Sequence, residues 1–340
     1  MQISVRSSKK IDKKLAILNV LKEHEAPLTS SCILDLLSTS GLELSERTIR
    51  FYLAQTDQEG LTRPCGRKGR VLTEAGLAEL QSSQVMYMPG YLSAKMDQMV
   101  YKMTFDLAMR SGTVVVNTSL VEPQKLASCL DKVCKVFEKG YGMGRLMTLL
   151  GPGETVGQIT VPPDKIGFCT VCSITINGVL LKHGIPMSCR FGGLLMLKDG
   201  RPFRFTDVIH YDGTTIDPLE VFIRSGMTNY HGAISTGNGL IGASFREVPA
   251  DSRQRLLNLS ERLEEVGLGA IMEVGLPNQP LLDIPVAPAR VGVIVVGGLN
   301  PIAILEEVEH RIVSRALAGL LEFDRLFDYR HAAKRLEQYL

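Results

Sequence analysis

The feature that most constrains the fold of this 340-residue chain is a segment that occurs twice. Residues 167–186 read GFCTVCSITINGVLLKHGIP, and residues 291–304 read VGVIVVGGLNPIAI. In each copy a short apolar run of the strand type leads directly into a helix start. The match extends in front of both copies, because three residues recur 125 positions later: Val161, Pro163 and Gly167 as Val286, Pro288 and Gly292.

The order of the surrounding elements repeats as well. In residues 99–188, alternation from Tyr101 to Leu107 predicts a hairpin, which is followed by a helix, short strands and the helix from Ser173. Residues 229–315 repeat this order, beginning with a predicted strand at 230–234. We therefore expect a mixed α/β domain of two halves related by a pseudo-twofold axis, with a ligand in the cleft between them.

Two segments lie outside this repeat. Residues 189–228 are predicted to form an insertion that could cover the cleft, with paired strands, a turn at 212–215 and a helix from Asp217. Residues 305–340 have apolar side chains at helical spacing, which predicts mostly helix serving the core or a dimer interface.

Residues 1–82 predict a separate domain. Three helical segments are followed by LTRPCGRKGRVL, two short apolar ends around a glycine-rich basic tip. Ser45 precedes the third helix, SERTIRFYLAQTDQEG, as an N-cap. Three helices and a basic hairpin are typical of a winged helix-turn-helix, whose third helix enters the major groove. Residues 83–98 lose the helical period, so we place a linker there.

Basic residues in this N-terminal domain predict contacts with double-stranded DNA. Arg47 and Arg50 fall on the polar face of the third helix together with Ala54, where arginine can pair with guanine. The hairpin has no acidic residue between its cations, which suits phosphate contacts. These candidates are Arg63, Arg67, Lys68 and Arg70. Winged helices also dock proteins, and similar ones occur on ribonucleases, so protein and RNA remain alternatives.

Composition narrows the class of protein. With 45% apolar and 22% charged residues the chain can bury a large core, and its formal net charge of +2 does not by itself indicate nucleic acid. Seven cysteines in apolar segments are typical of reduced cytosolic thiols. No apolar run approaches the ~20 residues of a membrane span. We expect a soluble, cytoplasmic protein.

The repeated helix starts predict a binding site for a small anion, because the N-terminus of a helix presents unpaired N–H groups. Hydroxyl-bearing turns and arginines could complete it. The effector-binding candidates are Cys172, Ser173, Arg190, Thr214, Thr215, Arg246, Gly297, Gly298 and Asn300. Each residue also has an ordinary structural interpretation, such as a surface charge or a glycine required by close packing.

Motifs for other chemistry are weak. Cys169 and Cys172 have CxxC spacing, but no second pair or spaced histidines complete a zinc site, so buried thiols are expected and no metal is predicted. Residues 140–144, GYGMG, end a helix and begin a strand, the reverse of a phosphate loop. No catalytic constellation stands out, so we predict no catalytic residue, no cofactor and no enzyme.

The motifs together resemble a known family. TVCSITINGVLLKHGIP, FGGLL, GTTIDPLEVFI, GMT, ASFREVP and VGVIVVGGLNPIA are similar to the effector domain of the NrpR family of nitrogen regulatory repressors, as is SERTIRFYL within a winged helix. The resemblance spans nearly the whole chain. It implies a repressor of nitrogen-assimilation genes that leaves its operator when 2-oxoglutarate accumulates.

We therefore predict a DNA-binding repressor that is a homodimer or higher oligomer, with a small dicarboxylate effector in the duplicated domain. An enzyme acting on a small carboxylate, fused to a winged-helix head, is the alternative from another class. A structural or RNA-binding protein without a small ligand is the third.

Overall fold

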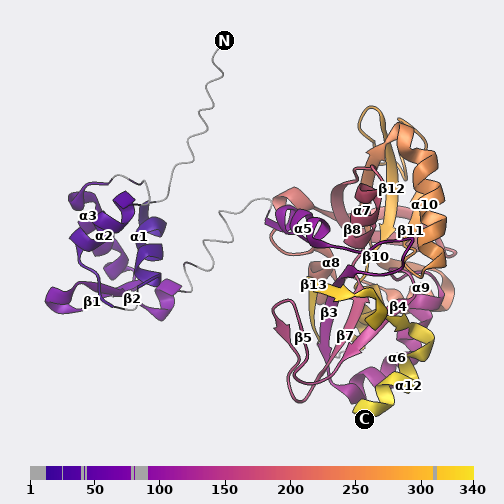
Figure 1. Cartoon of the computed structure of the whole chain (residues 1–340), viewed down its shortest axis with the longest axis horizontal. Helices are drawn as coiled ribbons and strands as arrows, with labels where there is room; N and C mark the ends of the chain where they lie inside the picture. Colours follow the sequence, from indigo (N-terminus) through magenta and orange to yellow (C-terminus); the bar gives the residue numbers. More distant parts are fainter. Residues whose placement is uncertain are drawn as a thin grey trace. The chain divides into compact units, whose positions relative to one another are not determined.

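The computed structural model describes residues 13–24, 26–39, 42, 44–77, 80, 91–308 and 312–340 (Figure 1). The chain divides into two compact units, Met1–Pro89 and Gly90–Leu340. We call them the head and the C-terminal unit. Each unit has its own apolar core, so each is described by itself.

The head has the predicted winged-helix arrangement of three helices and a hairpin. Its elements are α1 (Lys13–Lys22), α2 (Ser30–Thr39), α3 (Glu46–Gln58), β1 (Thr62–Pro64) and β2 (Arg70–Leu72). Ile17, Ile33, Ile49 and Leu53 are fully buried between the helices. The Ser45 hydroxyl accepts a hydrogen bond from the Thr48 N–H at 3.2 Å, which confirms the predicted cap of α3.

The wing, residues 62–72, is anchored to the segment that follows α1. Leu28 and Arg70 exchange two backbone hydrogen bonds of 3.0 and 2.9 Å. Gly69 makes this approach possible, because its φ is +112° and a Cβ there would lie 2.1 Å from the Leu28 carbonyl oxygen. The basic tip between the strands, Gly66–Lys68, is a 3₁₀ turn.

The C-terminal unit contains two five-stranded sheets in which every pairing is antiparallel. The first half of the repeat comprises β3 (Thr113–Val121), α6 (Pro123–Glu138), β4 (Leu146–Leu150), β7 (Ile166–Val171) and α7 (Ile174–Lys182). The second half comprises β10 (Gly239–Pro249), α10 (Arg253–Glu265), β11 (Ile271–Val274), β12 (Arg290–Val296) and α11 (Asn300–Glu307). The halves have the same order of elements and the same strand order, β3-β7-β4 and β10-β12-β11.

Each half also receives one strand from the chain that follows the other half. β8 (Ser188–Lys198) follows the first half but pairs with β10, and β13 (Val313–Glu322) follows the second half but pairs with β3. The sheets therefore read β13-β3-β7-β4-β14 and β11-β12-β10-β8-β9, with β9 (Arg201–His210) and β14 (Phe327–Asp328) at edges.

Hydrogen bonds at the two helix starts follow the same pseudo-symmetry. The Cys172 N–H donates to the Val115 carbonyl at 2.8 Å, and the Gly297 N–H donates to the Gly242 carbonyl at 3.0 Å. Each pair joins the end of the third repeated strand to the start of the first. The sequence repeat is therefore a repeat of backbone contacts.

One predicted strand is a helix, and another is shorter than predicted. Residues 101 and 102 belong to α5 (Tyr91–Lys102), which buries Leu92 and Met96 at helical spacing. The predicted hairpin persists at residues 105–113, where the Phe105 N–H donates to the Thr113 carbonyl at 3.0 Å and the Asp106 N–H donates to the Ser111 carbonyl at 2.8 Å. Residues 230–234 lie in α9 (Tyr230–Thr236), capped by Asn229 and closed by left-handed Gly237. Short alternating runs do not separate strand from helix.

Part of the predicted linker, residues 83–98, is also helical. Residues 83–90 lie outside the described part of the chain, whereas residues 91–98 belong to α5. The boundary between the compact units falls after Pro89.

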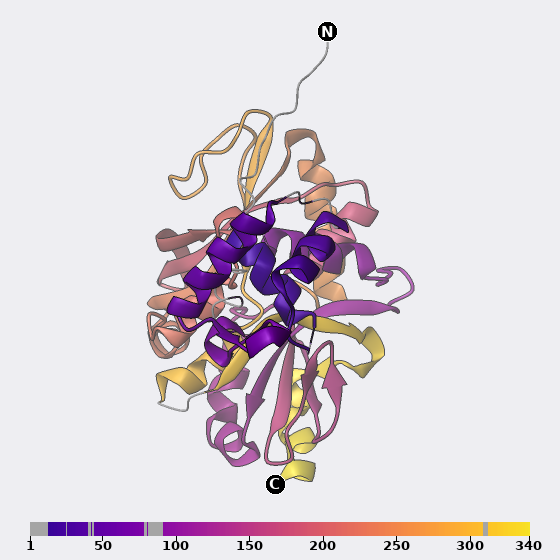
Figure 2. The same ribbon diagram turned by 90° about the vertical axis from the view of Figure 1, so that its left-hand side faces the viewer.

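Residues 189–228 are not a simple insertion, and residues 305–340 are not mostly helix. β8 and β13 are equivalent strands of the repeat. The prediction of helix for β13 is wrong because a register shift between Arg315 and Gly319 breaks the alternation of the strand. Figure 2 shows the yellow C-terminal segments lying with the magenta first half, away from the orange second half. The remaining elements are β5 (Thr155–Val156), β6 (Ile159–Thr160), α8 (Pro218–Arg224) and α12 (Ala332–Leu336).

Candidate functional site

The exposed face of α3 is the first candidate surface. Arg47, Arg50, Phe51 and Ala54 are exposed on it, while Ile49 and Leu53 face the core. Arg50 is partly held along the helix, since it donates to Glu46 Oε1 at 2.7 Å and to Ser30 Oγ at 3.3 Å. The hydrogen bonds from Ser30 and Arg50 lower the pKa of Glu46.

Phe51 is not among the contact residues predicted from the sequence, although its side chain is 65% exposed. A signal was present, because position 51 is one helical turn after Arg47 and one turn before Ala54. Both flanking residues are predicted to lie on the polar face, and the residue between them on that face is apolar.

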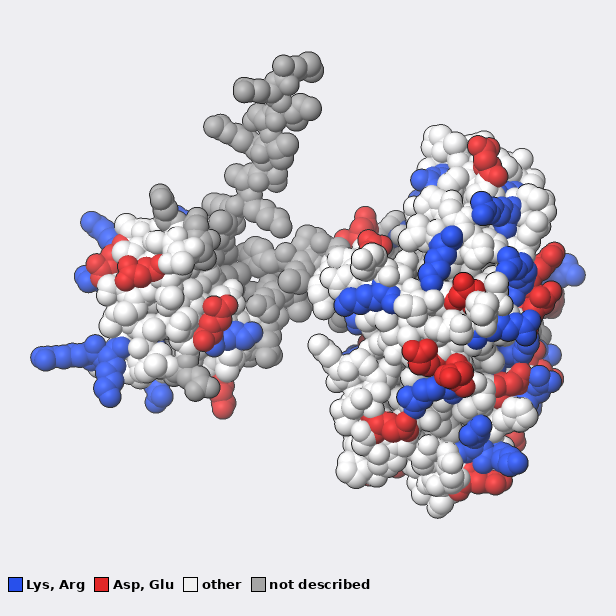
Figure 3. All heavy atoms as spheres, viewed as in Figure 1, with Lys and Arg blue, Asp and Glu red and all other residues white. Residues whose placement is uncertain are grey.

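The basic residues of the wing are of two kinds, exposed and ion-paired. Arg63, Arg67 and Lys68 are exposed, and Figure 3 shows lysine and arginine side chains projecting from this end of the head. Arg70 instead donates to Asp57 Oδ2 at 2.8 Å, and Thr62 donates to Asp57 Oδ1 at 2.6 Å. The Arg70 contact therefore ties the wing to α3.

In the C-terminal unit, four effector candidates lie in a tightly packed seam between the halves. A Cβ on Gly298 would lie 2.3 Å from the Val171 carbonyl oxygen, and the Thr170 hydroxyl donates to the Gly298 carbonyl at 2.6 Å. Asn300 is fully buried and donates to the carbonyls of Tyr141 and Gly242, both at 2.8 Å. Cys172 and Gly297 are buried in the same seam.

Arg246 lies where β10 of the second half meets α7 of the first half. It is 1% exposed, and its guanidinium donates to the Ser173 carbonyl at 3.0 Å, the Ser173 hydroxyl at 2.6 Å and the Asn177 side-chain oxygen. Its Nε donates to Ser244 Oγ at 2.9 Å. None of the ion pairs found within the described residues includes Arg246.

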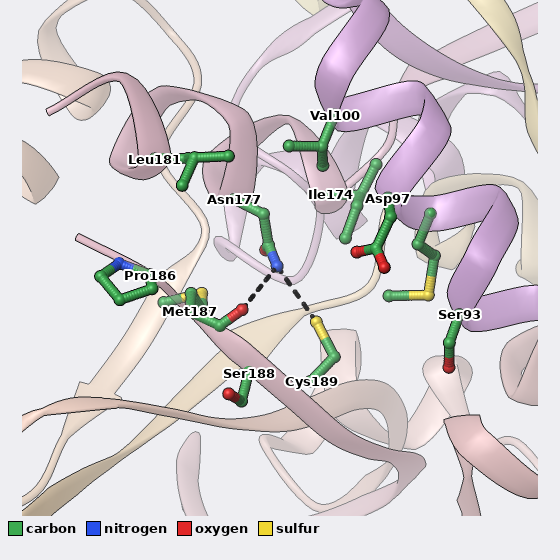
Figure 4. A pocket seen from close by; sticks show the side chains of 11 residues that line it. Ser93, Asp97, Val100, Ile174, Asn177, Leu181, Pro186, Met187, Ser188 and Cys189 are labelled. Carbon is green, nitrogen blue, oxygen red and sulfur yellow. Dashed lines mark hydrogen bonds between the residues drawn. The ribbon is translucent and has the colours of Figure 1, made fainter. Parts of the chain in front are cut away.

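A cavity of about 350 Å³ opens next to this arginine. α5 contributes Ser93, Met96, Asp97 and Val100 to its wall, α7 contributes Ile174, Asn177 and Leu181, and the remainder comes from residues 186–189. Figure 4 shows the Asn177 amide among these side chains, donating to the Met187 carbonyl at 3.4 Å and to Cys189 Sγ at 3.2 Å. Asn177 thus separates the cavity from the guanidinium of Arg246.

A second cavity of about 380 Å³ lies against another side of α5. Tyr91, Leu92 and Lys95 contribute to its wall, together with Thr215 and residues of α8 and β13. Its Glu220 carboxylate is already engaged by Arg224 at 3.3 Å and Arg315 at 3.5 Å. The α5 helix is therefore a wall shared by both cavities.

The remaining candidates have local partners. The Thr214 hydroxyl closes its own turn by donating to the Ile216 carbonyl at 2.8 Å. Arg190 donates to Glu247 Oε1 at 2.8 Å and to the Pro285 carbonyl at 2.7 Å. The structure therefore brings Ser173 and Arg246 together beside Asn177, and leaves Arg190, Thr214 and Thr215 outside that group.

The family described as NrpR regulatory domains NRD1 and 2 matches residues 90–328. The chain belongs to the NrpR family. Residues 15–80 match the Ribonuclease R winged-helix domain. The crystal structure of a nitrogen repressor-like protein from Methanococcus jannaschii is similar over 70% of this chain and 98% of that chain, with 29% identity and a TM-score of 0.59.

Three curated relatives support this NrpR assignment. Global nitrogen regulator NrpRI of Methanosarcina mazei is 31% identical over 317 residues, 93% of this chain and 98% of the relative. Global nitrogen regulators NrpR of Methanococcus maripaludis and Methanocaldococcus jannaschii are 31% and 30% identical, and the matches span 50% and 55% of their lengths. These relatives are named as regulators; this NrpR-family chain is likewise a regulator and not an enzyme.

Cysteine and metal chemistry find no support at the CxxC motif of this NrpR-family chain. Burial raises the pKa of the Cys169 and Cys172 thiols to about 12, so both stay protonated at neutral pH. Within the described ranges, no group of three or more His, Cys, Asp or Glu could hold a metal ion. No helix in the described part of the chain is long and apolar enough to span a bilayer.

Proposed function

We propose that this chain is a DNA-binding repressor of nitrogen-assimilation genes, and that 2-oxoglutarate releases it from its operator. Family membership and the names of the relatives support the nitrogen role. The exposed cations of α3 and the wing support DNA binding. A homodimer would present two α3 helices to half-sites one DNA turn, about 34–36 Å, apart.

Arg246 is the observation that carries the effector proposal. A guanidinium buried without a carboxylate partner costs free energy, and an anionic ligand next to it would reduce that cost. Asp217 influences Arg246 only at longer range, and burial raises the pKa of its own carboxyl group to about 6. A dicarboxylate in the cavity would contact Asn177, which accepts from Arg246, and would lie near the positive end of α7. It would reach the guanidinium itself only if the Asn177 side chain moved, and it would have to avoid the Asp97 carboxylate on the α5 wall.

The α5 helix offers a route from the ligand to the head. It forms one wall of the cavity, and it is the first described element after Leu80 of the head. If α5 is positioned differently in the DNA-competent and DNA-incompetent states, a ligand that contacts α5 binds the two states with different affinities. Such a ligand changes the affinity for DNA. The change is limited to the difference between its affinities for the two states.

The test is a DNA-binding titration at fixed salt with and without 2-oxoglutarate. The probe is the double-stranded operator that the full chain selects from random DNA. We expect 2-oxoglutarate to weaken binding roughly 5- to 150-fold, the usual range of allosteric coupling. A competitor RNA of equal length, suggested by the winged-helix match to Ribonuclease R, should bind more weakly than the operator.

Asn177→Asp tests the site while keeping a side chain of the same size at position 177. The new carboxylate would pair with Arg246, so the variant should fold, bind DNA and lose its response to 2-oxoglutarate. The matched control is Asn258→Asp on the exposed face of α10, which should keep the full response. An unchanged response in Asn177→Asp would remove Arg246 from the effector site.

A further inference from the structure

Phe51 presents an unexplained apolar surface on the helix proposed to read DNA. Its ring is 65% exposed, whereas Ile49 and Leu53 on either side of it in sequence are fully buried. Its ring contact within the described residues is an edge-on approach to Tyr52, with 5.4 Å between centroids. Phe51 therefore adds little to the core of the head, and its exposure requires another reason.

The neighbours of Phe51 indicate what covers it. Arg47 lies one turn before it, Ala54 lies one turn after it, and both are exposed on the same face of α3. The head also carries exposed cations on its wing, so an anionic polymer is the partner that its charge fits. In the major groove of DNA, the apolar group among the base edges is the 5-methyl group of thymine.

We propose that Phe51 is a specificity-determining residue that packs on the methyl groups of thymines next to the base pairs contacted by Arg47. The inference rests on the proposed function, since it requires α3 to enter the major groove. It adds an apolar contact to the hydrogen-bonding arginines. The operator should accordingly contain thymine, on either strand, beside the guanine that Arg47 contacts.

Deoxyuridine provides the test because it lacks the methyl group and keeps every base-pairing atom. Each thymine of the selected operator is replaced singly, and affinity for the wild-type chain is measured at fixed salt. One or two positions per half-site should lose about fourfold in affinity, the value of burying one methyl-sized group. In Phe51→Ala the same replacements should not change the affinity. In Phe51→Leu they should cause part of the loss seen with the wild type.

Gln58→Ala on the exposed end of α3 is the matched control and should respond to deoxyuridine as the wild type does. Thermal melting should show that Phe51→Ala leaves the head folded, because the ring is exposed. Equal deoxyuridine losses in wild type and Phe51→Ala, or none in either, overturn the methyl contact. A change in oligomeric state in Phe51→Ala without methyl dependence assigns the ring to a protein interface.

The two proposals fail in different ways. A chain that selects no duplex sequence overturns the proposed function and the thymine contact together. A chain that selects an operator and responds to 2-oxoglutarate, but shows no coupling between Phe51 and the methyl groups, overturns the contact alone.

Discussion

Asp57 on α3 gives one cation of the wing a role that its neighbours lack. Both of its carboxylate oxygens are used, one by Arg70 at 2.8 Å and the other by Thr62 at 2.6 Å. Sequence alone does not distinguish the four cations of the hairpin, because they share a charge and a short segment: Arg63, Arg67, Lys68 and Arg70. Only the fold shows that one of them has a carboxylate within reach.

Lys68 and Arg70 should therefore respond differently to alanine. Lys68→Ala should lower the affinity for all DNA duplexes about equally and reduce the salt dependence of binding by about one phosphate contact. Arg70→Ala should lower the melting temperature of the head through the loss of a partly exposed ion pair worth at most about 1 kcal/mol. Salt titrations and melting curves of both variants distinguish the roles, and identical effects would contradict the division.

Asp217 gives the C-terminal unit a pH dependence. Burial first, and then the charge of Glu220, raise the pKa of its carboxyl group from the usual 3.8 to about 6. Because the folded state favours the protonated acid, this stabilising contribution is complete below about pH 4 and is lost as pH rises through 6.

Asp217→Asn should remove this dependence, since an amide also accepts the capping bond from the Leu219 N–H. Between pH 4 and pH 7 the wild type should lose roughly 3 kcal/mol relative to the variant. Urea unfolding at several pH values measures this. Parallel curves for the two proteins would show that Asp217 is ionised in the folded state throughout.

At the scale of elements, the seam between the helix starts is tightly packed. The Gly298 backbone packs against Val171 and Cys172, and a Cβ there would lie 2.3 Å from a carbonyl oxygen. Two of the three atoms nearest to such a Cβ belong to the backbone of Val171 and Cys172, which cannot move aside as a flexible side chain can. A ligand is therefore better accommodated beside α5 than between the helix starts.

Gly298→Ala should destabilise the C-terminal unit by about 1–3 kcal/mol, the usual cost of overpacking. Gly213→Ala is the matched control, because a Cβ there meets nothing within 4 Å. Thermal melting compares them. If Gly298→Ala has the same melting temperature as the control, the helix starts are not in contact and the seam is open.

The elements that could be predicted from sequence were those with local signals. Ser45 as a cap, the apolar faces of the head helices and the repeated strand-to-helix turns all depend on residues close together in the chain. The position of β13 depends on β3, about two hundred residues away, and its register shift hides the strand period. Asn177 could be placed on α7 from sequence, but its contact with Arg246 requires the two halves to be packed.

At the scale of the whole molecule, the head and the C-terminal unit differ in how their functions could be predicted. The head carries its exposed cations on one helix and one hairpin, so residue types alone lead to the prediction of a nucleic-acid partner. In the C-terminal unit the nine candidates were chosen from both halves by residue type. Two of them, Ser173 and Arg246, meet because the halves are folded against each other.

The crossing of β8 and β13 between the sheets has a consequence for the origin of this architecture. A protein containing a single copy would have an open sheet edge, and its terminal strand would have no strand of its own copy to pair with. Two such proteins would complete each other by trading those strands, as domain-swapped dimers do. The present chain is then the covalently joined form of such a pair, and cutting it between the copies should yield fragments that reassemble.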